Sequence, residues 1–86
     1  MKGDLDKYVF NCLKDHHWWT FWELQELIQQ MTGKFYGETS ISAAIRNLRK
    51  FKQRQRFDLP LDLDTEVIEK KRRDSGKGYQ YRLIKQ

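Results

Sequence analysis

The side chains best suited to bind another molecule come from a short stretch around residue 46. Arg46 and Asn47 can each make paired hydrogen bonds to the edge of a nucleic-acid base, arginine to guanine and asparagine to adenine. Ser40 and Ser42 precede them, and such small residues would let the start of a helix enter the major groove without collision. We therefore expect this stretch to contact base edges, although an ordinary solvated helix face would carry similar residues.

A run of basic residues continues from this stretch without an intervening acid. Its members are Arg46, Arg49, Lys50, Lys52, Arg54 and Arg56. Contact with phosphates is the favoured interpretation, because lysine and arginine supply most of the sequence-independent affinity for DNA. The alternative is that some of these side chains are merely solvated, or that they cover the acidic segment 58–64.

A second basic cluster, residues 70–73, precedes a glycine-containing turn near the C-terminal end of the sequence. Alternation along a strand would put Lys70 and Arg72 on one face and Lys71 and Arg73 on the other. The residues nearest the turn are predicted to reach a phosphate or the minor groove, and these are Arg72, Arg73 and Lys77. The alternative is a solvated hairpin whose charges only prevent edge-to-edge aggregation.

The remaining polar residues do not indicate catalysis or metal binding. His16 and His17 lack further ligands at a suitable spacing, and the single cysteine, Cys12, allows neither an internal disulfide nor a cysteine zinc site. The acidic pairs at 23/26 and 62/64 are better explained by a helix cap and a loop. No nucleophile motif or phosphate-binding glycine loop is present. The sequence therefore predicts a protein that is not an enzyme and that needs no cofactor.

Four aromatic residues gather immediately before and at the start of a predicted helix. They are Trp18, Trp19, Phe21 and Trp22. They could form a stacking platform for bases, but we expect core packing, because a small domain needs bulky anchors near a helix start. One exposed tryptophan could instead mark a contact with another protein.

Three amphipathic helices are predicted to position these residues, over about 5–16, 21–32 and 40–51. Asp4 is a suitable N-cap for the first. In the second, Thr20 and Glu23 form a capping-box pattern and Gly33 can end the helix in the left-handed conformation. The hydroxyl residues at 39–40 are expected to cap the third helix, which follows the second after a short turn, as in a helix-turn-helix.

The rest of the sequence is predicted to be an extended connection followed by a hairpin. The helical period fades over 52–65, and residues 57–64 alternate apolar and acidic residues around Pro60, which favours an extended connection with a short edge strand as a further option. Residues 66–84 form the two arms of a hairpin joined through Gly76 and Gly78. Tyr79, Tyr81 and Leu83 are expected to face the helices. The fold class is therefore α+β: three helices followed by a C-terminal hairpin.

The charge of the chain is segregated along its length. The 86 residues are enough for one domain, 1–86, and carry a net charge of +5. Residues 1–33 hold three basic and five acidic residues, whereas residues 34–86 hold fourteen basic and seven acidic ones. This distribution favours a polyanionic partner on one face. No apolar stretch suits a membrane span or a signal peptide, so we expect no membrane association and a cytoplasmic location.

The sequence resembles the small winged helix-turn-helix proteins of bacteriophages and prophages over nearly its whole length. The most specific part is Ile-Ser-Ala-x-Ile-Arg-x-Leu-Arg-Lys at 41–50, followed by Tyr-x-Tyr-Arg-Leu at 79–83. The resemblance implies DNA binding through Ser42, Arg46, Asn47 and Lys50 of the recognition helix, with the basic residues of the wing on the DNA backbone. The segment 52–65 departs from the family, in which a shorter step leads from helix to wing.

These observations together predict binding of double-stranded DNA, most simply sequence-specific binding. Transcription regulation and an accessory role in phage replication or recombination, nucleoid-associated in a bacterial host, both fit. The alternative is a protein-interaction module that docks a host or phage protein through the aromatic cluster and the 57–63 loop. A single module of this size buries only roughly 600–1,000 Å² on DNA, so a homodimer or a larger nucleoprotein complex is a further option.

Overall fold

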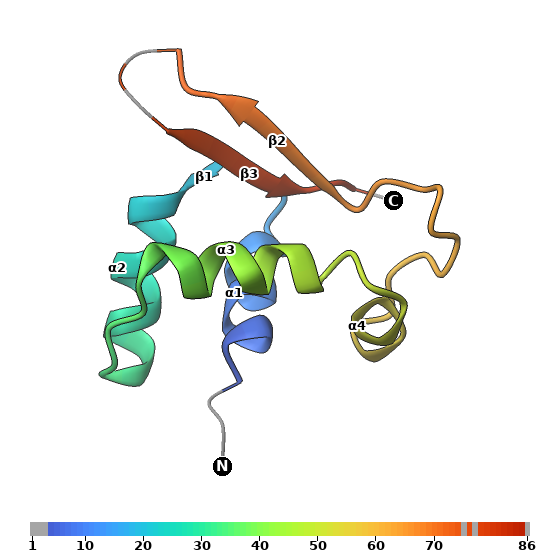
Figure 1. Ribbon diagram of the computed structural model, residues 1–86, viewed down its shortest axis with the longest axis horizontal. Helices are drawn as coiled ribbons and strands as arrows, with labels where there is room; N and C mark the ends of the chain where they lie inside the picture. The colour runs from blue at the N-terminus through green and yellow to red at the C-terminus, as the bar shows by residue number, and fades with distance from the viewer. Residues whose placement is uncertain (1–3, 75, 77, 86) are drawn as a thin grey trace.

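The computed structural model describes residues 4–74, 76 and 78–85, which form an α+β domain with the sheet packed across one end of the helices (Figure 1). The helices are α1 Leu5–Leu13, α2 Phe21–Thr32, α3 Glu38–Asn47 and α4 Phe51–Arg56. The strands are β1 Trp19–Thr20, β2 Ile68–Arg72 and β3 Tyr79–Leu83. The α+β class is therefore confirmed, whereas the predicted counts of helices and strands are wrong, since α4 and β1 were not expected.

The start and end of α2 follow local chemistry closely. The backbone N–H of Glu23 donates to Thr20 Oγ1 over 3.1 Å, and the N–H of Thr20 donates to Glu23 Oε1 over 2.8 Å. This reciprocal pair is the predicted capping box. Gly33 closes the helix with a φ of 73°, as predicted. By contrast, α1 begins after Asp4 without a side-chain cap and ends at Leu13, three residues before the predicted end.

The bounds of α3 differ from the predicted 40–51 at both ends. Gly37 takes the N-cap position with no side-chain hydrogen bond, so the hydroxyl residues at 39–40 already lie inside the helix and the predicted caps are wrong. The helix ends at Asn47, and the chain becomes extended at Lys50 before α4 begins. The predicted extended connection over 52–65 is therefore wrong in its first part, which is helical.

Arg54 of α4 is buried, which the periodicity of apolar residues in the sequence does not predict. Its side chain is 3% exposed, so a cation occupies the inward position where an apolar residue is normally expected. Nearby, the rings of Phe57 and Phe10 stack with centroids 4.5 Å apart, which packs the end of α4 against α1. Residues 57–66 contain no strand in the part of the chain that the structure describes, so the optional edge strand is not found there.

Arg54 organises the segment that follows α4. Its Nε donates to the carbonyl oxygen of Arg49 over 2.8 Å. Its Nη1 lies 2.6 Å from the carbonyl oxygen of Asp62, 2.9 Å from that of Thr65 and 3.3 Å from that of Pro60. Three backbone carbonyls from within segment 58–65 and one from before α4 thus converge on one guanidinium, which fixes the path of the segment.

The three strands form an antiparallel sheet in the order β1-β3-β2. In the predicted hairpin, Ile68 pairs with Leu83 and Arg72 pairs with Tyr79. The short strand β1 adds Trp19 opposite Tyr81 on the other edge of β3. Leu83 is buried as expected, but Tyr79 is 39% exposed, so only part of the predicted inward face of β3 packs on the helices.

The core joins α1, α2, α3 and the sheet. Its fully buried side chains include Leu13, Leu24, Ile28, Ile41, Leu48, Val67 and Ile68. Trp19 and Phe21 pack against this core as expected, whereas Trp22 is 48% exposed. Burial raises the pKa of the Cys12 thiol to about 11, with a smaller contribution from the charge of Asp15. No helix among the described residues is long and apolar enough to cross a membrane.

Candidate nucleic-acid interface

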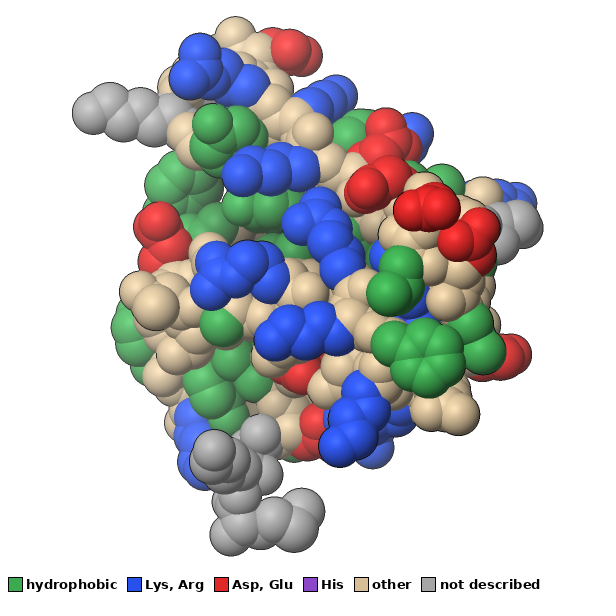
Figure 2. All heavy atoms as spheres, turned by 45° about the vertical axis from the view of Figure 1, so that its right-hand side comes forward, with side chains coloured by type: hydrophobic (Ala, Val, Ile, Leu, Met, Phe, Trp, Pro, Cys, Tyr) green, Lys and Arg blue, Asp and Glu red, His purple; other side chains and the backbone are tan. Residues whose placement is uncertain are grey.

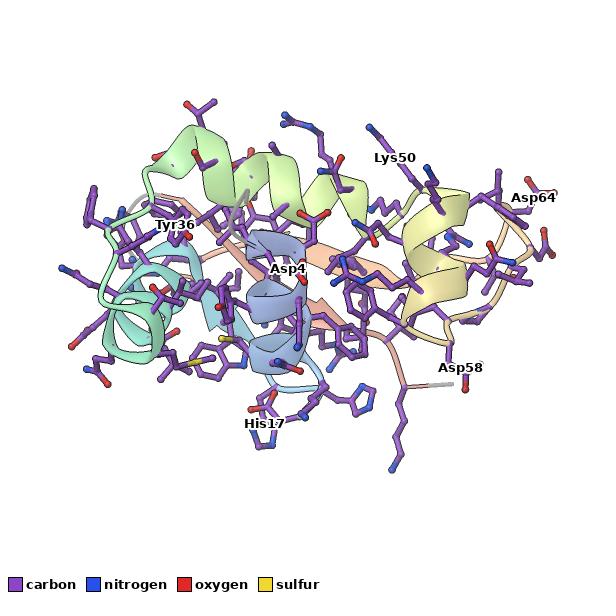
Figure 3. All side chains as sticks on the ribbon, turned by 90° about the horizontal axis from the view of Figure 1, so that it is seen from below. Asp4, His17, Tyr36, Lys50, Asp58 and Asp64 are labelled. Atoms are coloured by element: carbon purple, nitrogen blue, oxygen red, sulfur yellow. The ribbon has the colours of Figure 1, made fainter. Side chains whose placement is uncertain are left out.

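The outward face of α3 carries most of the predicted contact residues. Ile41, Ala44 and Ile45 turn toward the core. Because a helix turns by 100° per residue, the opposite side of α3 exposes Arg46. Lys50 is also exposed, three residues beyond the end of the helix. Of the other predicted residues here, Ser40 is exposed, whereas Ser42, Asn47 and Arg49 are partly buried at the flanks. Lys50 points outward at the junction of α3 and α4 (Figure 3).

A cleft of about 190 Å³ separates α3 from the hairpin. Its basic lining residues are Arg46 and Arg49 of α3 and Lys70 of β2. Lys70 was not among the predicted contacts. Residues two apart on a strand share one face of the sheet, so the burial of Ile68 could have indicated that Lys70 also faces α3. Ser42, Ile45 and Tyr81 complete the lining, so no acidic residue is among the described residues that form this cleft.

Arg49 connects the two walls of this cleft. Its Nη2 donates to the carbonyl oxygen of Ile68 over 3.3 Å, and its Nε is buried without a hydrogen-bond partner. The side chain is therefore held between α3 and β2, where it sets their separation. Its positive charge still faces the cleft, but its reach toward an external phosphate is shorter than that of Arg46.

A second cleft of about 430 Å³ lies between the end of α3 and α4. It is lined by Asn47, Lys50, Lys52, Gln53 and Arg56. Arg56 pairs with Asp4, and this hydrogen bond, opposed in part by burial, lowers the pKa of the Asp4 carboxyl. Gln53 likewise donates to Asp6. The positive field of this cleft therefore comes mainly from Lys50 and Lys52, both of which are exposed.

Arg54 does not belong to this surface, although the sequence favoured phosphate contact for the whole basic run. Its guanidinium is buried and donates to backbone carbonyls, so the prediction that Arg54 contacts a phosphate is wrong. The alternative, in which some of the basic side chains cover the acidic segment 58–64, holds for Arg54.

The basic residues of the hairpin point in different directions. Arg72 is exposed at the end of β2, whereas the guanidinium of Arg73 lies 5.4 Å from the ring centroid of Trp22 in α2. Lys71 lies with its Nζ 4.5 Å from the ring centroid of Trp18, and Arg82 covers the same tryptophan at the same distance. The predicted contact Lys77 lies outside the described residues. The structure thus brings Lys70 rather than Lys71 to the α3 side of the sheet.

One face of the molecule gathers the basic side chains. Figure 2 shows Lys and Arg side chains across the middle of the face on which α4 comes forward, with Asp and Glu side chains grouped beside them. The two clefts that flank α3 contribute six basic residues to this surface. Such an arrangement can hold the phosphates of a nucleic acid on both sides of a helix.

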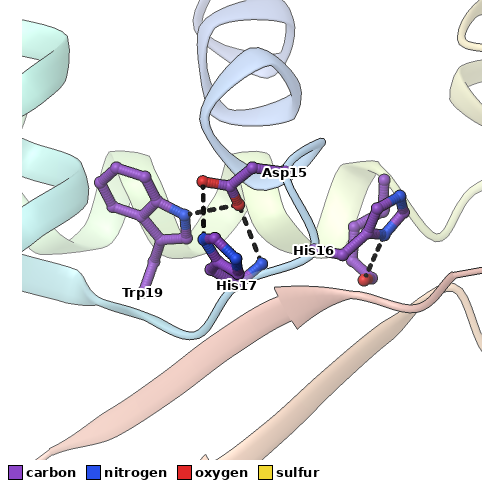
Figure 4. A network of polar contacts seen from close by, with 5 residues as sticks. Asp15, His16, His17 and Trp19 are labelled. Atoms are coloured by element: carbon purple, nitrogen blue, oxygen red, sulfur yellow. Dashed lines mark hydrogen bonds and ion pairs between the residues drawn. The ribbon is translucent and has the colours of Figure 1, made fainter.

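The histidines lie away from this surface and stabilise a turn. The Nδ1 atom of His16 lies 2.9 Å from the carbonyl oxygen of Leu83, and Asp15 accepts from the backbone N–H of His17 and the indole N–H of Trp19 (Figure 4). Burial alone would raise the pKa of Asp15, but these hydrogen bonds lower it. No group of three or more metal-ligating side chains occurs within the described residues.

Comparison with protein-family models, with curated proteins and with solved structures found no match to this chain.

Proposed function

We propose that this chain is a winged helix-turn-helix protein that binds double-stranded DNA. In this proposal α3 is the recognition helix and the β2–β3 hairpin is the wing. The order of the elements supports it: β1 lies between the first two helices, and the hairpin follows the third, with α4 as an insertion. The observation that carries the proposal is the pair of basic clefts on either side of α3, between which Arg46 is exposed.

The geometry supports a specific mode of docking. Arg46 lies on the outward side of α3, where it can reach a guanine edge in the major groove. Lys50 and Lys52 would contact phosphates on one side of the helix, and Lys70 with Arg72 would contact them on the other. Glu38 in the first turn of α3 repels phosphates, so the contacts are expected to concentrate along the C-terminal half of the helix.

Selection of bound sequences from a random duplex pool tests this function. We expect enrichment of a short motif, and a mismatch at the base pair read by Arg46 should weaken binding by roughly tenfold or more. A two-fold symmetric motif would indicate a dimer, and its spacing would give the geometry. Failure to retain any duplex at low salt would contradict the proposal. The regulatory or replicative role, and the relation to phage proteins, stay predictions.

Protein docking is the second candidate, and the geometry supports it less well. Leu61 and Leu63 are exposed, at 46% and 59%, on a segment held by Arg54. However, Leu59 is buried and Phe57 stacks on Phe10, so the 57–63 loop offers fewer apolar side chains than its sequence indicates. The aromatic cluster lies at the start of α2, at the opposite end of the molecule from α4 (Figure 1), so one partner would have to span both.

A further inference from the structure

A pocket lined by aromatic rings lies beside the basic cleft. Its volume is about 260 Å³, and it is formed where the first turns of α2 and α3 meet the start of β3. Its lining includes Phe21, Trp22, Glu38, Ser42, Tyr79 and Tyr81. Four aromatic rings, two of them phenols, therefore surround a single space together with one carboxylate and the hydroxyl of a serine.

The core does not account for all of these rings. Trp22 is 48% exposed and Tyr79 is 39% exposed, which leaves large apolar surfaces in contact with water. Both are nevertheless held in place: Lys70 Nζ lies 4.2 Å from the ring centroid of Tyr79, and Arg73 lies over Trp22. Phe21 meets Trp22 edge to face, with centroids 6.0 Å apart. The rings are thus positioned before any ligand arrives.

The turn of the hairpin fits closely against Trp22. Gly78 has a φ of 97°, and a Cβ atom at this position would lie 3.1 Å from Cη2 of Trp22. A side chain here would displace the indole, and the left-handed backbone would also be strained. The absence of a side chain at Gly78 therefore keeps Trp22 at the mouth of the pocket.

The pocket and the basic cleft are continuous along α3, because Ser42 lines both. A flat aromatic group in the pocket would therefore lie beside Arg46 and Lys70. A nucleotide combines these two needs, since it has an aromatic base attached to a phosphate. We propose that the pocket binds one unpaired nucleobase, so that the protein prefers a duplex with an unpaired nucleotide to a fully paired duplex. This inference rests on the proposed DNA binding.

Polar groups in the pocket match a base with an exocyclic amine. Glu38 can accept a hydrogen bond from the amino group of cytosine, and the Ser42 hydroxyl can donate or accept. Burial and then the charge of Glu38 raise the pKa of Tyr81, so its phenol stays protonated and can donate to a base carbonyl.

A cation is the other ligand that aromatic rings and a carboxylate could bind, as in pockets for methylated lysine. The surroundings of this pocket disfavour it. Arg46 and Lys70 lie in the adjoining cleft, and Arg73 lies over Trp22. This positive field repels a basic protein segment and attracts a phosphate chain.

Fluorescence anisotropy with three labelled duplexes of one sequence tests the proposal. The first duplex is fully paired, the second carries one unpaired cytosine, and the third carries an abasic nucleotide in place of that cytosine. The unpaired or abasic nucleotide is placed either at the end of the duplex or in an internal bulge, and both positions are measured. We expect the wild type to bind the cytosine duplex, in at least one position, roughly tenfold more tightly than the other two, because base–aromatic stacking provides this preference.

Variants assign the preference to the pocket. Trp22→Ala is expected to reduce the affinity ratio of cytosine to abasic duplex to about one, whereas Trp18→Ala, which alters a tryptophan outside the pocket, should keep it. Glu38→Gln changes an exposed side chain, so the fold should be retained, and it should reduce the preference for unpaired cytosine over unpaired thymine. This second variant keeps the test valid if Trp22→Ala does not fold.

Two results would overturn the proposal while leaving duplex binding intact. One is equal affinity of the wild type for all three duplexes at both positions. The other is a shift of the Trp22 indole signal in NMR spectra when trimethyllysine is added, with no shift when the duplex that carries the unpaired cytosine is added. That result would make the pocket a cation site. Absence of binding to every duplex, including the fully paired one, would instead refute the proposed function itself.

Discussion

At the scale of single residues, Arg54 shows how a charged side chain can take the place of a core residue. It is 3% exposed and donates to four backbone carbonyls, with no carboxylate among those partners. The dipoles of the carbonyls compensate for the lost hydration of the guanidinium. Three of these carbonyls belong to segment 58–65, so this one side chain ties the segment to α4.

Replacement of Arg54 should therefore destabilise the whole domain. We expect Arg54→Ala to lower the free energy of unfolding by about 3 kcal/mol, because several buried carbonyls lose their donor. Lysine should not restore it, since an ammonium cannot reproduce the planar fork. Urea denaturation measures the effect, with the exposed neighbour Lys52→Ala as control. Equal stability of the two alanine variants would show that the guanidinium does not hold the segment.

Residue types alone predicted some residues of the basic surface and missed others for a physical reason. Arg46 follows from helical periodicity, because the apolar side of α3 determines which residues face outward. Lys70 and the aromatic pocket depend on how three distant elements meet, which no local pattern contains. Arg54 was misassigned because charge normally excludes a residue from the core.

At the scale of secondary-structure elements, local chemistry decided which predictions held. The capping box of α2 and the glycines of the hairpin act through neighbours in the sequence, so both elements were predictable. Strand β1 has only two residues and exists through its pairing with β3. Helix α4 has six residues and depends on Arg54 and on contacts with α1. Neither has a sequence pattern long enough to indicate it.

Helix α4 is also tied to the start of α1 by the ion pair of Arg56 with Asp4, which predicts a pH dependence. The pKa of Asp4 is lower in the folded protein than its ordinary value of 3.8. The pair therefore contributes stability above that value, and the contribution is lost as the pH falls through the lowered pKa. The effect should be small, because both side chains are partly exposed to solvent, at 42% for Arg56 and 35% for Asp4.

Asp4→Asn isolates this contribution, since asparagine keeps the size and shape of the side chain but removes its charge. We expect the variant to be slightly less stable than the wild type at pH 7, and the difference to vanish at a pH well below 3.8. Thermal unfolding followed by circular dichroism across this range measures it. A difference that persists unchanged at low pH would assign the effect of the substitution to something other than the ion pair.

At the scale of the whole molecule, the fold converts a charge gradient along the sequence into a charged face. Residues 34–86 hold fourteen of the seventeen basic residues, and they form α3, α4 and the hairpin. Residues 4–33 supply α1 and α2, which pack behind α3 and carry few positive charges. Asp and Glu side chains border the basic side chains on this face (Figure 2), and they would limit how far a DNA duplex extends across it.

The salt dependence of binding tests most directly whether this face binds duplex DNA through α3. Affinity of the wild type should fall linearly with salt on logarithmic axes. Lys50→Ala should reduce the slope by about one, and Arg46→Ala should weaken binding to the preferred sequence by about 1–3 kcal/mol. The control is Lys14→Ala, at the C-terminal end of α1. His17, three residues further along the chain, lies on the side of α1 opposite to α3 (Figure 3).

We expect Lys50→Ala and Arg46→Ala to differ from the wild type and Lys14→Ala to match it. Identical affinity and slope for the wild type, Lys50→Ala and Arg46→Ala at every salt concentration would contradict this mode of binding, because neither α3 nor the turn after it would then touch the DNA.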